Sequence, residues 1–238
     1  MSINVLNEKI NSSHHIVFFG GAGLGTESGI PDFRSPDGLY SQKYAYPPEM
    51  MLSHTFYVRK QSEFFRFYFD KLIYKDAKPN AAHYKLAEME AKGKLDGIVT
   101  QNIDGLHQVA GSKNVQELHG SVHRNYCERC GKFYDLDYMI AHQPIPKCTC
   151  GGTIKPDVVL YEESLPEETV EAAIELISNA DMLIIGGTSL TVYPAAGLIG
   201  YFHGDCLALV NKDKTPADKN ADIVIHEKIG EVFSQITV

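Results

Sequence analysis

The sequence predicts an α/β fold, a doubly wound parallel sheet with helices on both faces and a smaller second lobe. Two observations support this fold class. Short, continuously apolar runs recur along the chain, and stretches with helical spacing of apolar side chains lie between them. Such an alternation is typical of parallel strands that are joined by helical crossovers.

The apolar runs are the candidate strands of this sheet. Because their apolarity is continuous rather than alternating, we expect both faces of each strand to be buried. The runs cover residues 16–19, 97–100, 182–185, 207–210 and 223–225.

Three further stretches have the periodicity of amphipathic helices. Residues 79–92 place Leu86 and Met89 on one face. Residues 166–179 open with Pro-Glu-Glu. This suits a helix N-terminus, because Pro has no N–H to leave unpaired and carboxylates favour the positive end of the helix dipole. A final helix is expected over residues 229–236.

Two stretches do not fit the alternation, and we expect them to form the second lobe. Residues 39–77 are rich in Tyr and Phe and are typical of a loop followed by a helix, whereas residues 123–155 hold four of the five cysteines. The large domain is then built from residues 1–38, 78–122 and 156–238.

The composition excludes several classes of protein. The 238 residues include 22 Lys and Arg against 30 Asp and Glu, a net charge of −8. This charge argues against direct binding of nucleic acid through its phosphates. No apolar run approaches the roughly 18 residues that would span a membrane. The first residues lack the apolar centre of a signal peptide, so we expect a soluble cytoplasmic protein.

A glycine-rich segment, residues 20–29, directly follows the first candidate strand. Such a turn lets backbone N–H groups approach a pyrophosphate, which then sits at a helix N-terminus. The segment departs from the G-x-G-x-x-G fingerprint, since Thr26 occupies the third glycine position and no acidic ribose ligand follows about twenty residues later. We therefore expect dinucleotide binding by an unusual version of the fold, with a purely structural turn as the alternative.

Four cysteines form two close pairs separated by seventeen residues, Cys127-x-x-Cys130 and Cys148-x-Cys150. This spacing is typical of a structural Cys₄ zinc site, because thiolate pairs on tight turns can converge about 2.3 Å from one ion. Gly131 and residues 151–152, both glycines, suit such turns. Four reduced thiols without a metal are the alternative, and Cys206 is not expected to be a ligand.

Polar residues follow the second candidate strand directly, in the run Thr-Gln-Asn-Ile-Asp-Gly-Leu-His over residues 100–107. In an open α/β sheet, ligands bind at the carboxyl ends of the strands. Gln101, Asn102 and Asp104 are therefore candidate site residues, with a structural Asn/Asp turn as the alternative. The same rule marks residues 186–190 and Asn211.

Together these segments resemble the sirtuins, the NAD-dependent protein deacylases, over nearly the whole chain. The matching motifs come in the family's order: residues 21–34, 100–107, 117–121, the four cysteines, 155–166, 187–195 and 210–212. The resemblance implies a Rossmann-like NAD-binding domain and a small lobe made of a zinc ribbon and a helical insertion. It further implies that NAD and an acyl-lysine meet in the cleft between them.

The resemblance also implies a role for individual residues. His119 matches the family's general base, and Asn102 and Asp104 are expected beside it as catalytic residues. The expected NAD contacts are Ala22, Thr26, Phe33, Arg34, Gln101, Asn102, Ile103, Asp104, His119, Thr188, Ser189, Asn211 and Lys212. The two edges expected to hold the substrate peptide as an added strand contain Val158, Val159, Leu160 and Tyr161 on one side and Leu190 and Tyr193 on the other.

The activity that this resemblance implies is NAD-dependent protein lysine deacetylation. NAD would be consumed as a co-substrate, nicotinamide released and the acetyl group transferred from lysine to ADP-ribose, with one structural zinc. Acetylated proteins or peptides would be the partners. A protein ADP-ribosyltransferase on the same scaffold is the alternative. An ordinary NAD-dependent oxidoreductase and a non-catalytic zinc-ribbon module are disfavoured, the first by the incomplete fingerprint and the second by the negative charge.

The chain departs from the family pattern at a few positions. Gly25 stands where many members carry Ser, Glu162 replaces a usual Gly, and the second cysteine pair is one residue shorter than usual. Phe65 and Tyr68 stand where succinyl- or malonyl-preferring sirtuins carry Tyr and Arg. An uncharged pocket would leave a carboxylate without a partner, so acetyl-lysine is expected to be preferred over succinyl-lysine.

Overall fold

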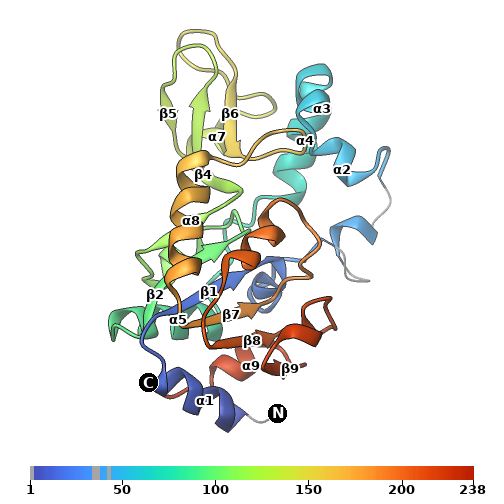
Figure 1. The fold of residues 1–238 in the computed structure, drawn as a ribbon. Coiled ribbons are helices and arrows are strands. Elements are labelled where there is room, and N and C mark those ends of the chain that lie inside the picture. The colour runs from blue at the N-terminus through green and yellow to red at the C-terminus, as the bar shows by residue number, and fades with distance from the viewer. Residues whose placement is uncertain (1–2, 34–37, 42–43) are drawn as a thin grey trace.

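The computed structural model describes residues 3–33, 38–41 and 44–238, and within them the sheet that the sequence predicts is present. Six parallel strands lie in the order β3-β2-β1-β7-β8-β9 (Figure 1). Their bounds are Ile16–Gly20 for β1, Leu95–Thr100 for β2, Val115–Glu117 for β3, Met182–Gly186 for β7, Cys206–Val210 for β8 and Ile223–Ile225 for β9. The predicted doubly wound α/β class is confirmed.

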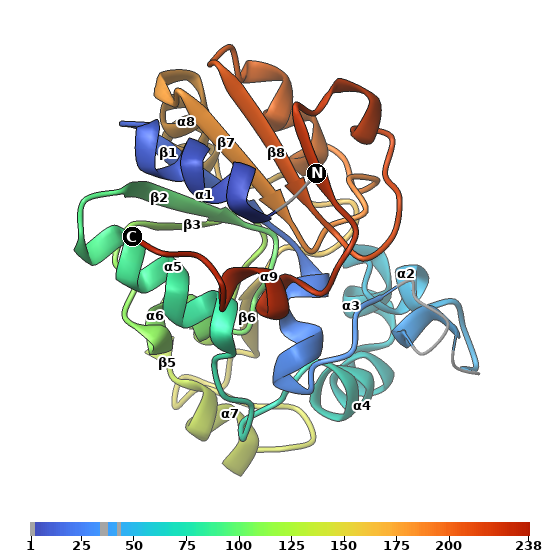
Figure 2. The ribbon, with the colours of Figure 1, turned by 90° about the horizontal axis from the view of Figure 1, so that it is seen from below.

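Helices cover both faces of this sheet. One face carries α1 (Ile3–Ser12), α5 (Ala81–Ala91), α6 (Leu106–Ala110) and α9 (Ile229–Phe233) (Figure 2). The other carries α8 (Glu167–Asn179) and the 3₁₀ segments η3 (Ala195–Tyr201) and η4 (Asp218–Asn220). Successive strand residues alternate between the two cores: Phe18 packs in the α5 and α9 core, and Phe19 packs in the α8 core. Both faces of the strand are therefore buried, which explains its continuous apolarity.

The three predicted helices of the large domain are present with slightly shorter bounds. α5 begins after Asn80, whose side-chain oxygen accepts hydrogen bonds from the N–H groups of Ala82 and His83. This cap satisfies groups that the helix itself leaves unpaired. α9 ends at Phe233, and Ile236 lies in the turn beyond it with 1% of its surface exposed.

The small lobe combines the two stretches that interrupt the alternation. Residues 120–158 contribute the antiparallel sheet β5-β4-β6, with β4 at Gly120–Cys127, β5 at Phe133–Tyr134 and β6 at Ile154–Val158, and the helix α7 at Leu136–Ala141. The other stretch forms η2 (Leu39–Ser41) and the helices α2 (Pro48–Met51), α3 (His54–Arg59) and α4 (Gln61–Lys71). Phe64 and Tyr57 share one hydrophobic core with Val122 and Ile154, so the two insertions pack as a single body.

Candidate active site

A cleft of about 1620 Å³ lies where the carboxyl ends of the parallel strands face the small lobe. The segments that follow all six strands of the large sheet contribute to its walls, as expected for ligand sites in open α/β sheets. The predicted site residues that line it are Ala22, Thr26, Phe33, Gln101, Asn102, Ile103, Asp104, His119, Val158, Val159, Leu160, Tyr161, Thr188, Ser189, Tyr193, Asn211 and Lys212.

Two of the predicted site residues are not among those that line the cleft. Leu190 packs in the core on the α8 side of the sheet with 6% of its surface exposed and does not line the cleft. Its apolar side chain is buried while the neighbouring Thr188 and Ser189 face the cavity. Arg34 lies outside the described residues.

The glycine-rich segment after β1 packs against the turn after β7. The N–H of Gly23 donates to the carbonyl of Gly187 at 2.7 Å, and a Cβ on Gly23 would lie 2.8 Å from that oxygen. Only glycine allows this approach, which leaves Ala22 and Thr26 facing the cleft beside Thr188. The helix that begins in this segment is a 3₁₀ helix, η1 (Ala22–Ser28).

Hydrogen bonds to the end of β1 and to the segment after β7 hold the run that follows β2. The N–H of Gln101 donates to the carbonyl of Gly20, and the side-chain amide of Gln101 donates to the hydroxyl of Thr188 at 3.1 Å. Asp104 accepts from the N–H of Leu106 at the start of α6, and burial raises the pKa of its carboxyl group. The side-chain nitrogen of Asn102 is buried and has no partner among the described residues. It is therefore a donor that is available to a ligand in the cleft.

His119 follows β3 and is held in one tautomer. Its Nδ1 lies 2.9 Å from the carbonyl oxygen of Gln101. A carbonyl can only accept, so Nδ1 carries the proton and Nε2 keeps its lone pair. Burial lowers the pKa of His119, which keeps the ring neutral at neutral pH. The arrangement therefore presents an oriented base at the wall of the cleft.

Sequence reasoning missed some residues that line the cleft. Glu227 and Lys228 follow β9, and Asp32 lies in the segment after η1. The rule that marked Asn211 after β8 also applies to the end of β9, so the first two could have been found in the same way. His123 also lines the cleft, and its Nε2 donates to the carbonyl of Asp104 at 2.9 Å. Only the pairing of the two lobes reveals that contact.

The four predicted metal ligands converge in the small lobe. The ligand atoms of Cys127, Cys130, Cys148 and Cys150 all lie within 4.8 Å of one another. The Cys127–Cys150 and Cys130–Cys148 sulfur pairs are 3.5 and 3.6 Å apart. A tetrahedral zinc with bonds of about 2.3 Å would hold its sulfurs roughly 3.8 Å apart, so the set fits a closed zinc site. The shorter second pair therefore still brings all four sulfurs together.

The two positions considered for acyl recognition lie elsewhere. Phe65 and Tyr68 are fully buried in the aromatic core of the small lobe and are not among the residues that line the cleft. The expected pocket at these two side chains is therefore not formed in this structure. The preference for acetyl over succinyl stays a prediction.

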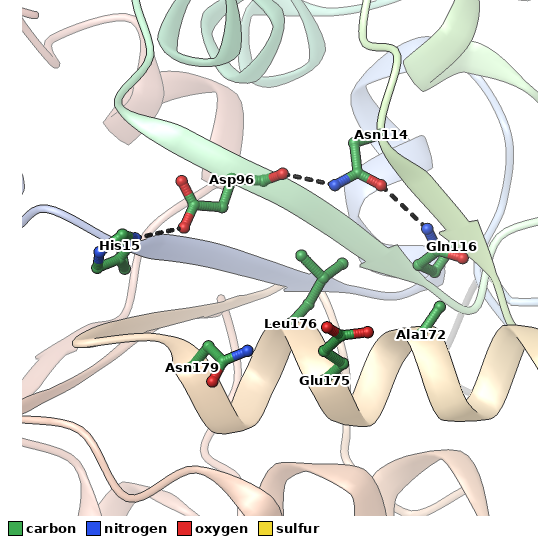
Figure 3. Close-up of a pocket in the computed structure, with 8 residues that line it drawn as sticks. All are labelled: His15, Asp96, Asn114, Gln116, Ala172, Glu175, Leu176 and Asn179. Carbon is green, nitrogen blue, oxygen red and sulfur yellow. Dashed lines mark hydrogen bonds and ion pairs between the residues drawn. The ribbon is translucent and has the colours of Figure 1, made fainter.

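A second hollow of about 560 Å³ lies between α8 and the strands β2 and β3 (Figure 3). Its polar side chains bond mainly to one another: His15 pairs with Asp96 at 2.9 Å, and the Gln116 amide donates to Asn114. The large cleft, with the unpartnered Asn102 and the oriented His119, is the stronger candidate.

The Sir2 family model matches residues 21–194, more than half of the chain. The chain belongs to the Sir2 family. The matched range includes Asn102, His119 and all four clustered cysteines, so both the cleft and the thiol cluster lie within the family's region.

The similarity extends over nearly the full length of known Sir2-family proteins. An NAD-dependent protein deacetylase of Clostridium acetobutylicum is 60% identical over 238 residues, which cover 98% of this chain and 97% of that protein. One of Clostridium perfringens is 59% identical, with 98% of each chain covered. The structure of a Sir2 with a p53 peptide and NAD⁺ has a TM-score of 0.85 and 39% identity, covering 98% of this chain and 96% of that one. A structure of Sir2 bound to acetylated peptide has a TM-score of 0.87 and 38% identity, with the same coverage.

Proposed function

We propose that this Sir2-family chain is an NAD-dependent protein lysine deacetylase. The observation that carries the proposal is His119, whose Nε2 is left as a base by the hydrogen bond from Nδ1 to Gln101 and which lines the cleft beside Asn102 and Asp104. The relatives named as NAD-dependent protein deacetylases support the same activity. Acetyl-lysine, NAD and one water would give free lysine, nicotinamide and acetyl-ADP-ribose.

The cleft divides NAD binding among the strand ends. Ala22, Thr26 and Phe33 are proposed to contact the pyrophosphate and the nicotinamide ribose, and Arg34 joins them on the basis of the resemblance alone. Residues 101–104 receive nicotinamide and its ribose. The side chains proposed for the adenosine half are Thr188, Ser189, Asn211 and Lys212.

The chemistry assigned to the chain's own residues is binding, orientation and proton transfer. NAD supplies an electrophilic ribose carbon, because its nicotinamide leaves as a neutral pyridine. Asn102 offers its unpartnered side-chain N–H groups at that end of the cleft, and Asp104 lies beside it. His119 Nε2 then accepts the proton of a ribose hydroxyl, which activates that oxygen for its attack on the acyl group.

Acetylated peptides are proposed to lie between residues 158–161 and Tyr193. An extended peptide that adds a strand to these edges would gain backbone hydrogen bonds without depending on its side chains. The backbone beside the core-packed Leu190 belongs to the second edge, although the side chain itself points into the protein.

The four clustered thiols are proposed to hold one structural zinc. All four donors are thiolates once deprotonated, so a closed site leaves no position for a substrate. No helix among the described residues is long and apolar enough to cross a membrane. We propose a cytoplasmic location, because a tight cluster of four cysteines with the spacing of a metal site is more typical of a reducing compartment than of a secreted, disulfide-bonded protein.

The chain is proposed to consist of one large domain and two insertions. We propose that residues 1–38, 78–122 and 156–238 belong to the NAD-binding domain, with 39–77 and 123–155 as the helical and zinc-ribbon insertions. The strands β4 and β6 of the small lobe extend beyond the last of these ranges, to Gly120 and Val158. The test of the function is nicotinamide release with and without an acetyl-lysine peptide. Release that requires the peptide supports deacetylation. If label from NAD instead becomes attached to protein, the chain acts as an ADP-ribosyltransferase and the proposal is wrong.

A further inference from the structure

Glu162 adopts a backbone conformation that glutamate rarely takes. Its φ is 76°, in the left-handed region where a Cβ crowds the following carbonyl. The conformation costs about 1 kcal/mol relative to the common regions. Contacts elsewhere must therefore hold the residue in place, and its carboxylate makes such a contact.

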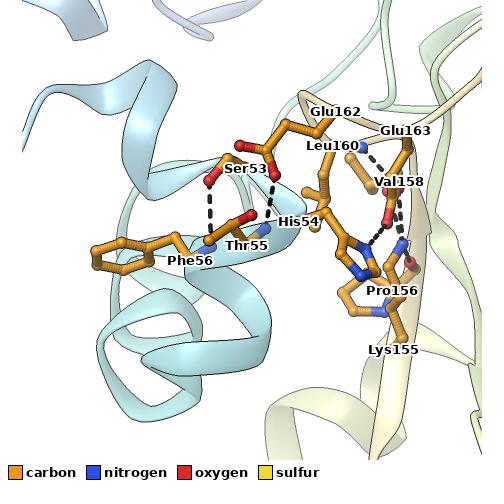
Figure 4. Close-up of polar contacts among 10 residues, drawn as sticks. All are labelled: Ser53, His54, Thr55, Phe56, Lys155, Pro156, Val158, Leu160, Glu162 and Glu163. Carbon is orange, nitrogen blue, oxygen red and sulfur yellow. Dashed lines mark hydrogen bonds and ion pairs between the residues drawn. The ribbon is translucent and has the colours of Figure 1, made fainter.

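The start of helix α3 receives these contacts (Figure 4). The N–H of Thr55 donates to Glu162 Oε2 at 2.8 Å, and the N–H of His54 donates to the carbonyl of Tyr161 at 3.0 Å. The N–H of Tyr161 in turn donates to the carbonyl of Leu52 at 3.0 Å. Ser53 is the N-cap of α3, and its hydroxyl accepts from the N–H of Phe56. Residues 161–162 accept from the N–H groups of His54 and Thr55, which the helix itself leaves without a partner.

Glu163, the next residue along the chain, bonds to three other residues through its carboxylate. It accepts from the N–H of Leu160 at 2.9 Å, from Lys155 Nζ at 3.1 Å and from His54 Nδ1 at 2.8 Å (Figure 4). Burial raises the pKa of Glu163, but these donors outweigh it and the pKa is lowered overall. Glu163 therefore stays charged. Its carboxylate connects Lys155 of β6 and His54 of α3 to the loop that follows β6.

The segment that these carboxylates hold is also bonded to the catalytic region. The N–H of Val159 donates to the carbonyl of His119 at 3.0 Å, and residues 158–161 line the cleft. One end of the segment is therefore fixed beside the general base, and the other end is fixed at α3.

We propose that Glu162 and Glu163 are positioning residues that hold the peptide-binding edge, residues 158–161, in register with His119. The inference rests on the proposed function, which assigns this edge to the substrate peptide. Both residues also line the cleft, but their carboxylate oxygens are bonded to the protein itself, Glu162 to the N–H of Thr55 and Glu163 to the N–H of Leu160. Losing them lets the edge shift away from α3, which weakens peptide binding and leaves NAD binding unchanged.

The test compares Glu162→Ala, which removes the carboxylate and keeps the strained backbone, with Glu162→Gly, which removes both carboxylate and strain. Steady-state kinetics give KM for an acetyl-lysine peptide and for NAD separately. We expect Glu162→Ala to raise the peptide KM about three- to tenfold, the effect of one lost hydrogen bond, with the NAD KM within about twofold of wild type. Glu162→Gly should show a smaller rise, because glycine adopts a positive φ without cost.

Glu171→Gln is the matched control, since Glu171 is an exposed carboxylate on α8 that does not line the cleft. It should leave both KM values unchanged. A second readout, amide hydrogen exchange of residues 159–161 in the full-length protein, needs neither substrate. It should rise in Glu162→Ala and in Glu163→Ala and stay unchanged in Glu171→Gln.

Two results would overturn the inference. One is an unchanged peptide KM and unchanged exchange in Glu162→Ala. The other is a parallel rise of both KM values with a lower Tm, which indicates a general structural role. Failure of the proposed function is a different outcome: wild-type protein would then show no peptide-dependent nicotinamide release, and the exchange measurement would decide the positioning role alone.

Discussion

His119 is the side chain on which the proposed chemistry depends most. The Gln101 carbonyl fixes its tautomer, and burial lowers its pKa. We predict that His119→Ala reduces the deacetylation rate by about 10²–10⁴, the usual cost of losing a general base, while NAD binding survives. Rate assays and NAD titration by calorimetry measure the two quantities. A rate within threefold of wild type would remove His119 from this role.

The same histidine determines the expected acid limb of the pH profile. Because burial lowers the pKa of His119 below the ordinary value of histidine, about 6.5, the ring becomes protonated only at a lower pH than a free histidine does. We therefore predict that the decline of kcat/KM toward acid pH has its midpoint below pH 6.5. A decline with its midpoint above 6.5 would contradict a buried, neutral base.

Asn102 is assigned a different step from that of His119. Its side-chain nitrogen has no partner among the described residues and faces the part of the cleft that we propose receives nicotinamide, so Asn102→Ala should slow nicotinamide release itself. Single-turnover release of labelled nicotinamide in the presence of acetyl peptide measures this step. Normal release followed by slow deacetylation would assign Asn102 to a later step.

Helices α5 and α6 meet through two buried histidines. The rings of His83 and His107 lie 4.9 Å apart, and burial lowers their pKa values to about 4 and about 3. In the unfolded chain both titrate near 6.5, so the unfolded state gains protons first as the pH falls. The contribution of the two neutral rings to the free energy of unfolding is therefore complete above pH 6.5. It decreases as the pH falls toward the pKa values of the folded protein.

We predict from this pair that the free energy of unfolding falls steeply between pH 6 and 4, by about 1 kcal/mol per pH unit for each histidine. Urea unfolding at several pH values measures it. The exposed His203→Gln serves as a control that should leave the slope unchanged. Equal stability at pH 7 and pH 5 would contradict the assignment of both rings as buried and neutral.

The zinc ribbon is a second element with a direct test. We predict one zinc per chain, lost in Cys148→Ser, because four converging sulfurs are needed to close the tetrahedron. Chelation should loosen the small lobe and reduce activity indirectly. Elemental analysis that finds no zinc in protein purified without chelator would contradict the site, as would full zinc retention in Cys148→Ser.

Elements with strong local signals could be predicted from the sequence, and elements fixed by distant contacts could not. β1 and β7 are buried on both faces, so their apolar runs identified them. β3 is a three-residue edge strand, Val115–Glu117, whose two partly exposed residues give no such signal. The strand-end rule found Asn102 and Asn211. The Glu162 contact with Thr55 joins residues 107 positions apart, and only the folded chain reveals it.

At the scale of the whole molecule, an ion-pair network links the two sheets. Arg124 on β4 bonds to Glu117 on β3 of the large sheet and to Asp157 on β6 at 2.8 Å. Glu117 is 7% exposed, so removing its partner leaves a buried charge unpaired. We predict that Arg124→Leu lowers the free energy of unfolding by about 1–2 kcal/mol. Lys75→Met, which breaks an exposed pair with Asp137, should change it by less than about 0.5 kcal/mol and is the control.

The central claim is that NAD is consumed to remove an acetyl group from lysine in the cleft between the two lobes. The most direct test is the fate of that group, followed by mass spectrometry of the reaction of wild-type protein with NAD and an acetyl-lysine peptide. We predict equal amounts of deacetylated peptide, nicotinamide and acetyl-ADP-ribose. Free acetate formed without NAD consumption, or ADP-ribose attached to protein with the peptide still acetylated, would contradict the claim.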